Sequence, residues 1–408
     1  MREVVIVDMA RSAVGKMGGA LKDVRPIELL SQVATAVVER NQTKVKKDMY
    51  DYVIMGQVKQ NSECANIARN LVLRIGLPEE TPATCVTIAC GSGLLSIEEG
   101  AEMIKNGFAD IILAGGVETM SGGEYFLSYK SNQAFGNNNV TLLDAILAGG
   151  GGGAPVERYG NIPMGITAEN LVDIHNISRE EQDKFGFRSQ TLALKSIAAG
   201  DFKAEIIPIK YPKADGSIGI FDTDEGPRKP NMESMSKLKP VFKKDGSVTA
   251  ANSSTRNDGA GVALIMSREK ADELGIKPRA RFVAAGIAGV DPSIMGRGPV
   301  PATKIAMNKA GLTLKDMDAV ELNEAFAGQS LAVYREWEKD WGIDSEWEDK
   351  HINPWGGAIA IGHPLGGSGC IITTKLLYGL ERTGGKYGLS TMCCGGGIGA
   401  AGIIEILD

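Results

Sequence analysis

The residue best suited to covalent chemistry is Cys90, in the run Cys90-Gly91-Ser92-Gly93. The apolar residues 86–89 before it predict a strand, and the residues after it predict a helix. Free N–H groups at the start of a helix lower the pKa of a thiol, which favours a nucleophile. A single cysteine is more often a small buried core residue, but Gly91 and Gly93 would let a ligand approach closely.

The imidazole of His363 is a suitable partner for such a thiol. It is one of three histidines and lies in Gly362-His363-Pro364-Leu365-Gly366. If it faces Cys90, it can take the thiol proton and later donate a hydrogen bond to a developing oxyanion. His175 and His351 have no motif around them, so we interpret them as surface or structural residues.

Two further predicted strand ends carry reactive or polar side chains. Cys393 and Cys394 precede Gly395-Gly396-Gly397 at the end of a predicted strand over 388–392. Adjacent residues of a strand point to opposite faces, so at most one of them enters a shared site, and the other belongs to the core. Asn323 lies at another strand-to-helix corner, where it could cap the helix or hold a water or a substrate oxygen.

Alternating strands and helices must position these residues. We expect strands over 4–8, 52–55, 84–89 and 110–115, alternating with helices over 26–40, 64–75 and 92–105. This alternation, with nearly continuous apolar strands, is typical of a largely parallel sheet covered by helices. A strand over 262–266 closes the set, and a second set begins with 281–285.

The second set repeats the first. Aligning residues 47–53 with 315–320 needs one gap and places Cys90 and His363 at matching strand-to-helix corners. We therefore infer two related halves, each presenting one reactive side chain.

An irregular region separates the halves. It contains one clear helix, 179–199, which begins with the capping-box pattern of Ser178 and Glu181. Its five consecutive glycines, 149–153, could be a slack linker or a mobile cover over the site. We divide the chain into an N-terminal half (1–118 and 248–271), a loop domain (119–247) and a C-terminal half (272–408).

Composition excludes several classes of protein. The chain has 408 residues, of which 43% are hydrophobic and 23% charged, and no apolar run is long enough to span a membrane. The net charge is -6 and no dense cluster of Lys and Arg occurs, which excludes a nucleic-acid partner. Six cysteines without a CxxC pair indicate reduced thiols and a cytoplasmic protein. Strand-like residues begin at Val4, so we expect no signal peptide.

Together, these motifs resemble the thiolase family, which comprises acetyl-CoA acetyltransferases and 3-oxoacyl-CoA thiolases. The resemblance rests on the order and spacing of the segments around Cys90, Asn323, His363 and Cys393, and it covers essentially the whole chain. Three further segments also match the family: 164–170, 248–252 and 298–304.

The resemblance implies an α/β thiolase fold. Two duplicated βαβαβαββ halves would form a five-layered α-β-α-β-α body, with the inserted loop domain binding CoA at the entrance. Cys90 would accept the acyl group of a 3-oxoacyl-CoA in a ping-pong reaction, and Cys393 would act as acid and base at the α-carbon. Cys394 would then face the core. CoA would be a substrate, and no metal or tightly bound cofactor is expected.

The resemblance also implies roles for other residues. His363 and a water held by Asn323 would form one oxyanion hole, and the N–H groups of Cys90 and Gly395 a second. Three further positions match those that bind CoA or line the acyl pocket: Arg228, Ser254 and Met164. We expect a homodimer or a dimer of dimers.

Several features depart from the family pattern. Pro163 replaces a common His, and Arg256 replaces a small or apolar residue. Arg256 could bind a substrate carboxylate or form a structural salt bridge with Asp258. The Trp-rich segment 337–348 could be an amphipathic surface helix or a docking surface. The region 121–139 resembles the tetramerisation loop of some members only weakly.

These departures keep two alternatives open. The chain could be a specialised thiolase for a carboxylated or aromatic substrate, such as benzoylsuccinyl-CoA, that works with a small partner subunit. It could also be a non-catalytic thiolase-like subunit.

Overall fold

The structure, a computed structural model, describes residues 2–62, 64–127, 141–148 and 153–407. The N-terminal half builds a helix-covered sheet. Its strands are β1 (Val4–Ser12), β3 (Tyr52–Gly56), β4 (Ala83–Val86), β5 (Ile111–Thr119) and β11 (Asn257–Ser267). Its helices are α1 (Pro26–Asn41), α2 (Ile67–Arg74), α3 (Ser92–Lys105) and α9 (Arg268–Glu273). β3 runs parallel to β4 and β5, whereas β11 is antiparallel to β1 and β5.

The C-terminal half repeats this plan. Its strands are β12 (Ala280–Gly289), β13 (Ala319–Leu322), β14 (Tyr387–Cys394) and β15 (Ile398–Ile406). Its helices are α10 (Pro299–Ala310), α11 (Ala327–Trp341), α12 (Ser345–His351), α13 (Ala358–Ile361) and α14 (Leu365–Thr383). β13 runs parallel to β14, and β15 is antiparallel to β14 and β12, as β11 is to β5 and β1.

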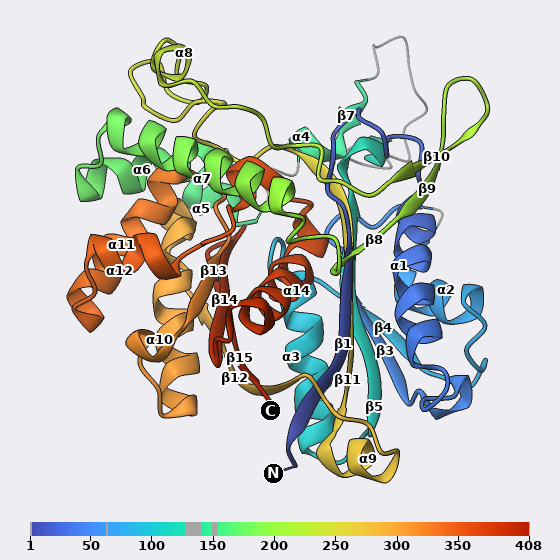
Figure 1. Ribbon diagram of the computed structural model, residues 1–408. Coiled ribbons are helices and arrows are strands. Elements are labelled where there is room, and N and C mark those ends of the chain that lie inside the picture. The colour runs from blue at the N-terminus through green and yellow to red at the C-terminus, as the bar shows by residue number, and fades with distance from the viewer. Residues whose placement is uncertain (1, 63, 128–140, 149–152, 408) are drawn as a thin grey trace.

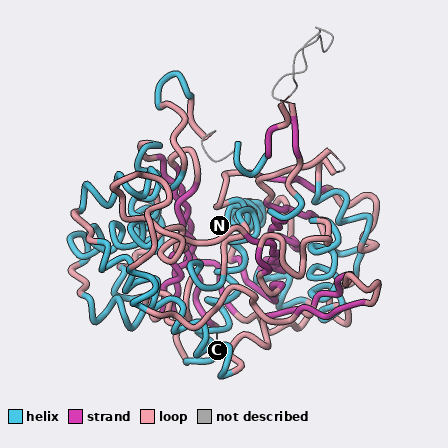
Figure 2. The backbone as a smooth tube through the Cα atoms, turned by 90° about the horizontal axis from the view of Figure 1, so that it is seen from above, coloured by secondary structure: helices cyan, strands magenta, loops and turns pink. Residues whose placement is uncertain are grey.

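The two sheets join edge to edge. The strand order is β13-β14-β15-β12-β1-β11-β5-β3-β4, and β1 and β12 pair only at Val5 with Arg281 and Ile6 with Ala280. α3 and α14 lie between the sheets, α1 and α2 cover one outer face, and α10 and α11 cover the other (Figure 1). The view from above likewise shows helices between and outside two groups of strands (Figure 2). The predicted five-layered α-β-α-β-α body is therefore confirmed (Figure 1).

Glycines let the two central helices touch. A Cβ on Gly93 of α3 would lie 2.7 Å from the carbonyl oxygen of Gly366 in α14, and one on Gly369 would lie 2.3 Å from the backbone nitrogen of Leu94. Because larger residues would separate these helices, the glycines bring the first turns of α3 and α14 into contact.

A loop region crosses the top of the two sheets (Figure 1). Its elements are β6 (Tyr125–Phe126), β7 (Leu143–Asp144), α4 (Ala145–Ala148), α5 (Val156–Tyr159), α6 (Met164–His175), α7 (Arg179–Ala199), β8 (Ile206–Ile207), β9 (Ile209–Pro212), β10 (Ile218–Phe221) and α8 (Met232–Ser236). The capping box predicted for α7 is confirmed, with the Ser178 hydroxyl bound to the Glu181 N–H. The glycines 149–152 and most of segment 121–139 lie outside the described residues. The remaining short elements are β2 (Gly15–Lys16) and the 3-10 turns Lys47–Met49, Met120–Gly122, Pro292–Arg297 and Leu314–Asp316.

Two predicted boundaries were wrong. β4 ends at Val86 rather than residue 89, because Ala89 adopts a positive φ that no strand accommodates. His363 follows the short helix α13 rather than a strand. In the C-terminal half, a single bridge between Val320 and Ile352 stands where β4 pairs with β3 in the N-terminal half.

Candidate active site

A tight turn presents Cys90 between β4 and α3. Ala89 has a φ of 54°, a left-handed conformation that costs free energy in a residue other than glycine. The Ser92 hydroxyl accepts the Ile88 N–H at 3.0 Å and donates to the Ala89 carbonyl at 2.6 Å, which holds the turn. Gly91 then begins α3. Cys90 therefore lies at a helix start, as the sequence predicts.

The charge state of Cys90 differs from the sequence-based expectation. Burial raises the pKa of the thiol to about 11, although the N–H groups of Gly395 and of Cys90 itself lower it. These two N–H groups lower the pKa by less than burial raises it, because placing a thiolate away from water costs more free energy than the two hydrogen bonds supply. At neutral pH the group is a thiol, so a base must take its proton before it can act as a nucleophile.

His363 can be that base. Its Nδ1 is 2.7 Å from the Ser368 hydroxyl, and its backbone N–H donates to Asn257 Oδ1 at 3.0 Å. Burial lowers the pKa of the imidazole to about 4, so it is neutral at pH 7. Its Nε2 is buried, with no hydrogen-bond partner among the described residues. The contact between Gly93 and Gly366 brings its helix to the helix of Cys90. The sequence did not indicate Asn257, because it reaches His363 from 106 residues away, whereas Ser368 lies only five residues after His363 in the same segment.

The two adjacent cysteines point to opposite faces, as predicted. Cys393 packs with Met295 and Ala325, against Met164 and Phe326. Cys394 packs in a different cluster, against which Cys90 also packs, and its sulfur would lie 2.7 Å from a Cβ on Gly91. Burial raises the pKa of both thiols, and the neighbouring Cys90 raises it further. Both therefore lie near Cys90, and Cys393 is the one beside Met164.

Asn323 follows β13 and is 1% exposed. Its role as a helix cap is wrong, because α11 begins four residues later with Phe326 at the cap position. In the part of the chain that the structure describes, neither Nδ2 nor Oδ1 of Asn323 has a hydrogen-bond partner. The adjacent Glu324 fixes this segment by accepting from the Ser189 hydroxyl at 2.6 Å and from Asn353 Nδ2 at 2.8 Å. Asn323 and His363 thus both offer unused buried polar atoms, which suits holding a water or a substrate oxygen.

Met164 of the loop region packs beside Cys393 and close to Gly395. The Met164 sulfur lies 3.8 Å from where a Cβ of Gly395 would be, and the Ser254 N–H donates to the Ala325 carbonyl at 3.0 Å. A Cβ on Gly153 would lie 2.5 Å from the Gly396 nitrogen. The end of the predicted glycine linker therefore rests on the glycines that follow Cys393 and Cys394.

The two predicted arginines are exposed. The Arg228 backbone N–H donates to Gln190 Oε1 at 2.8 Å, and nearby Gly226 packs against the Ala360 carbonyl of α13. Arg256 forms an isolated backbone bridge with His363. Its predicted salt bridge with Asp258 is absent from the described ion pairs, because Asp258 accepts the N–H and hydroxyl of Ser121 instead.

The tryptophans of the Trp-rich segment pack against the hydrophobic core of the C-terminal half. Trp337 is fully buried, and Trp341 and Trp347 pack against the same cluster. Trp341 stacks edge to face on Trp337 at 6.3 Å, and Trp347 stacks on His351 at 4.6 Å. The segment is not the single surface helix that we expected, because Trp337 and Trp341 lie on α11 and Trp347 on α12. The packing of all three against the core of this half favours a structural role over a docking surface.

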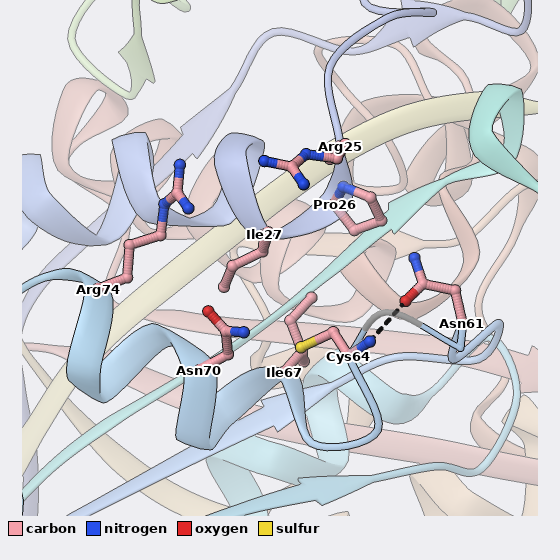
Figure 3. Close-up of a pocket in the computed structure, with 8 residues that line it drawn as sticks. All are labelled: Arg25, Pro26, Ile27, Asn61, Cys64, Ile67, Asn70 and Arg74. Carbon is pink, nitrogen blue, oxygen red and sulfur yellow. Dashed lines mark hydrogen bonds between the residues drawn. The ribbon is translucent and has the colours of Figure 1, made fainter.

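The cavity shown in Figure 3 lies away from these residues. It has a volume of about 100 Å³ and lies between α1, the segment before α2, and α2 itself. Its lining is Arg25, Pro26, Ile27, Asn61, Cys64, Ile67, Asn70 and Arg74. It contains none of the predicted site residues, so we do not assign the chemistry to it.

The described residues offer neither a metal-ligand cluster nor a membrane-spanning helix. No group of three or more His, Cys, Asp or Glu side chains there is arranged to hold a metal ion. No described helix is long and apolar enough to cross a membrane.

Comparison with known proteins gives matches over the whole chain. The thiolase N-terminal domain matches residues 4–269, and the thiolase C-terminal domain matches residues 276–406. An acetyl-CoA acetyltransferase of Syntrophomonas wolfei is 47% identical over 413 residues, covering 100% of both chains. The human mitochondrial 3-ketoacyl-CoA thiolase is 42% identical and covers 99% of this chain and 98% of its own.

Two solved structures are similar to this chain over its whole length. The Bacillus anthracis acetyl-CoA acetyltransferase superposes with a TM-score of 0.93 at 41% identity, covering 100% of this chain and 99% of its own. The human mitochondrial 3-ketoacyl-CoA thiolase in complex with CoA gives a TM-score of 0.91 at 41% identity, with 100% and 98% coverage.

Proposed function

Since the chain belongs to the thiolase family and is an acyltransferase, we propose that it cleaves a 3-oxoacyl-CoA, or forms one in reverse, through an acyl group on Cys90. The observation that carries the proposal is the closeness of Cys90 and Cys393, since the charge of Cys90 raises the pKa of Cys393. Among the described residues, His363 Nε2 and the Asn323 amide are also buried without a hydrogen-bond partner. The non-catalytic alternative is disfavoured, because every residue that the reaction needs is present.

The first half of the reaction forms the acyl-enzyme. His363 Nε2 takes the proton of the Cys90 thiol, and the sulfur bonds to the 3-keto carbon. The keto oxygen becomes an oxyanion and accepts from the N–H groups of Cys90 and Gly395. The bond between C2 and C3 then breaks, and its electron pair moves to C2. His363 and a water on Asn323 stabilise the resulting enolate until Cys393 gives C2 a proton.

The second half transfers the acyl group to CoA. The thiolate of Cys393 takes the proton of the CoA thiol, and the CoA sulfur attacks the thioester carbonyl on Cys90. The Cys90 sulfur leaves and recovers its proton from His363. Both thiols return to their starting state, which their raised pKa values favour.

The loop region supplies the proposed CoA site. Arg228 offers an exposed cation for the nucleotide phosphates, Met164 packs against the cluster of Cys393, and the Ser254 N–H donates to Ala325 of the same cluster. A similar solved structure, the human thiolase, holds CoA. CoA is therefore proposed as a substrate of this chain.

Assembly follows from two exposed features of the described residues. β4 is an edge strand of the sheet, and we propose that it pairs with a second copy to form the predicted homodimer. Tyr125 and Phe126 are exposed on the β6–β7 hairpin, which could join two dimers. No disulfide joins any of the six cysteines in the described parts of the chain, which fits a reducing compartment such as the cytoplasm.

Mass spectrometry of the chain after addition of a 3-oxoacyl-CoA tests the proposal. We expect an acyl adduct on Cys90 that added CoA removes. Cys90→Ser should abolish the adduct and the turnover, whereas Cys393→Ser should still be acylated but should not exchange the α-proton of acetyl-CoA with solvent. Near-normal thiolysis by Cys90→Ser would disprove the assignment.

A carboxylated substrate is the second candidate, and the position of Arg256 supports it. Its backbone bridges to His363, and no described ion pair neutralises its guanidinium. A panel of acyl-CoAs, with and without a candidate partner subunit, tests this candidate. Arg256→Met should lower kcat/KM for a dicarboxylic acyl-CoA by roughly ten- to a hundredfold and leave an uncharged one nearly unchanged. Equal losses on both, or strong activity of the isolated wild-type chain on acetoacetyl-CoA, would remove this candidate.

A further inference from the structure

Glu118 is a buried titratable group beside the reaction centre that the proposed chemistry does not use. It lies in β5 with 1% of its surface exposed, opposite Gly259 of β11. It is close enough to Cys90 that its charge raises the pKa of that thiol. A carboxylate here works against forming the thiolate, so its presence needs another reason.

Three backbone N–H groups surround this carboxylate. Oε2 accepts from Val58 at 3.0 Å and from Gly366 at 3.1 Å, and Oε1 accepts from Lys59 at 3.1 Å. Val58 and Lys59 follow β3 in the N-terminal half, whereas Gly366 is the second residue of α14 in the C-terminal half. One side chain thus joins the two halves where their reactive corners meet.

The bond to Gly366 acts on the segment that carries His363. His363 and Gly366 lie in the turn that begins α14, and a Cβ on Gly116 of β5 would lie only 2.2 Å from the Gly366 carbonyl oxygen. The start of a helix carries a partial positive charge, so a buried carboxylate both satisfies its free N–H and is stabilised by it. Glu118 therefore fixes where the first turn of α14 sits relative to β3 and β5.

We propose that Glu118 is a positioning residue for the reaction: its carboxylate holds the first turn of α14 so that His363 faces Cys90. This inference rests on the proposed function. Glu118 makes no described hydrogen bond to a reacting atom: it holds the backbone of Gly366, Val58 and Lys59, and its charge acts on Cys90 only by raising the pKa of that thiol.

Only the ionised Glu118 carboxylate can hold the first turn of α14 in this way. A protonated carboxyl turns one acceptor oxygen into a donor, which would face an N–H donor. Burial raises the pKa of Glu118 to about 7, while its three N–H donors and the Lys59 charge lower it. The other titratable groups that face it are Cys85 and Cys90. The ionised fraction of Glu118 therefore increases as pH rises through 7, and the turnover rate should increase with it.

Glu118→Gln tests the proposal, because it keeps the shape and removes the charge. We expect kcat to fall by about tenfold or more from the misplaced His363, with KM for CoA within about twofold. The rise of kcat through pH 7 should disappear. Thermal stability at pH 8 should be kept, since the neutral amide is cheaper to bury than a carboxylate. Glu118→Asp should recover part of the rate and keep the pH dependence.

Glu98→Gln is the matched control. Glu98 lies on α3, and burial raises its pKa also to about 7, but its neighbours are Lys309, Glu102 and Lys105 rather than the turn of α14. It should leave kcat and the pH profile unchanged.

Acylation of wild-type Cys90 is measured first, so that failure of the proposed function is seen separately. With an active wild type, an unchanged kcat and pH profile in Glu118→Gln would overturn the inference. So would a parallel loss of stability and activity in both Glu118 variants with the pH profile retained, because Glu118 would then serve only the fold.

Discussion

The two reactive residues sit at matching corners of the two halves, and the residue before each has a positive φ. Ala89 precedes Cys90 with a φ of 54°, whereas Gly362 precedes His363 with a φ of 117°. Both corners then lead into a central helix, α3 or α14. Both reactive residues thus follow a positive φ, but Gly362 has an extended ψ of 169° at the end of α13, whereas Ala89 lies in a left-handed turn after β4.

The corners differ in how the turn is held. At Cys90 the turn is local, with the Ser92 hydroxyl bonded to Ile88 and Ala89. At His363 the backbone is bonded to Asn257, which also donates to the Gly15 carbonyl. The nucleophile is thus positioned by its own segment, and the base by a strand from the other half. A change in the fold should disturb His363 sooner than Cys90.

The largest effect is expected from removing His363. His363→Ala loses the base and one oxyanion donor, and we expect kcat to fall by about 10²–10³-fold, equivalent to about 3–4 kcal/mol. Steady-state thiolysis measures this, and Ser368→Ala, which removes only the partner of Nδ1, should cost less. A loss below tenfold would show that His363 is not the functional counterpart of Cys90.

Gly362→Ala tests how strictly the second corner is built. A Cβ there would lie 2.4 Å from the Asn257 side chain, and the φ of 117° suits only glycine. We expect a loss of about 1–3 kcal/mol of unfolding free energy from backbone strain alone, measured by urea denaturation. Gly384→Ala, where nothing lies within 4 Å of the Cβ, separates strain from crowding. An unchanged stability would contradict the strict geometry that we describe.

The pH dependence of Cys90 alkylation tests whether burial or the helix start has the larger effect on the pKa of this thiol. Since burial raises the pKa of this thiol to about 11, the thiolate fraction should increase about tenfold per pH unit from pH 7 to pH 10. Iodoacetamide labelling followed by peptide mass spectrometry measures the rate, with Cys90→Ser to identify labelling elsewhere. A plateau below pH 9 would mean that the helix start outweighs burial.

The smallest effect is expected at the first corner. Ala89→Gly relieves a left-handed residue but gives the unfolded chain more freedom, so stability should change by less than about 1 kcal/mol. The added freedom before Cys90 should lower the acylation rate by a few-fold. Comparing acylation rate and stability in this variant with those of Gly362→Ala would show which corner depends more on backbone conformation. A large loss of stability would refute the view that the Cys90 turn is held locally.

The sequence by itself determined the family and the architecture. Motif order around Cys90, Asn323, His363 and Cys393 carried the resemblance, and apolar periodicity carried the alternation of strands and helices. These are local properties, because a strand or helix needs its pattern and a motif needs its neighbours. The opposite orientation of Cys393 and Cys394 also followed from the geometry of a strand. The domain boundaries and the roles of the site residues stay predictions.

Only the tertiary structure decided the properties that depend on burial and on distant partners. The sequence suggested a lowered pKa for Cys90, but a motif does not show how much protein surrounds a sulfur atom, and burial reverses the direction. The sequence also allowed Asn323 to cap a helix, but in the folded chain its amide has no hydrogen-bond partner among the described residues. Glu118 belongs to no motif, because its contacts come from residues about 60 and 248 positions away in the chain. Desolvation and long-range hydrogen bonds exist only once the chain has folded.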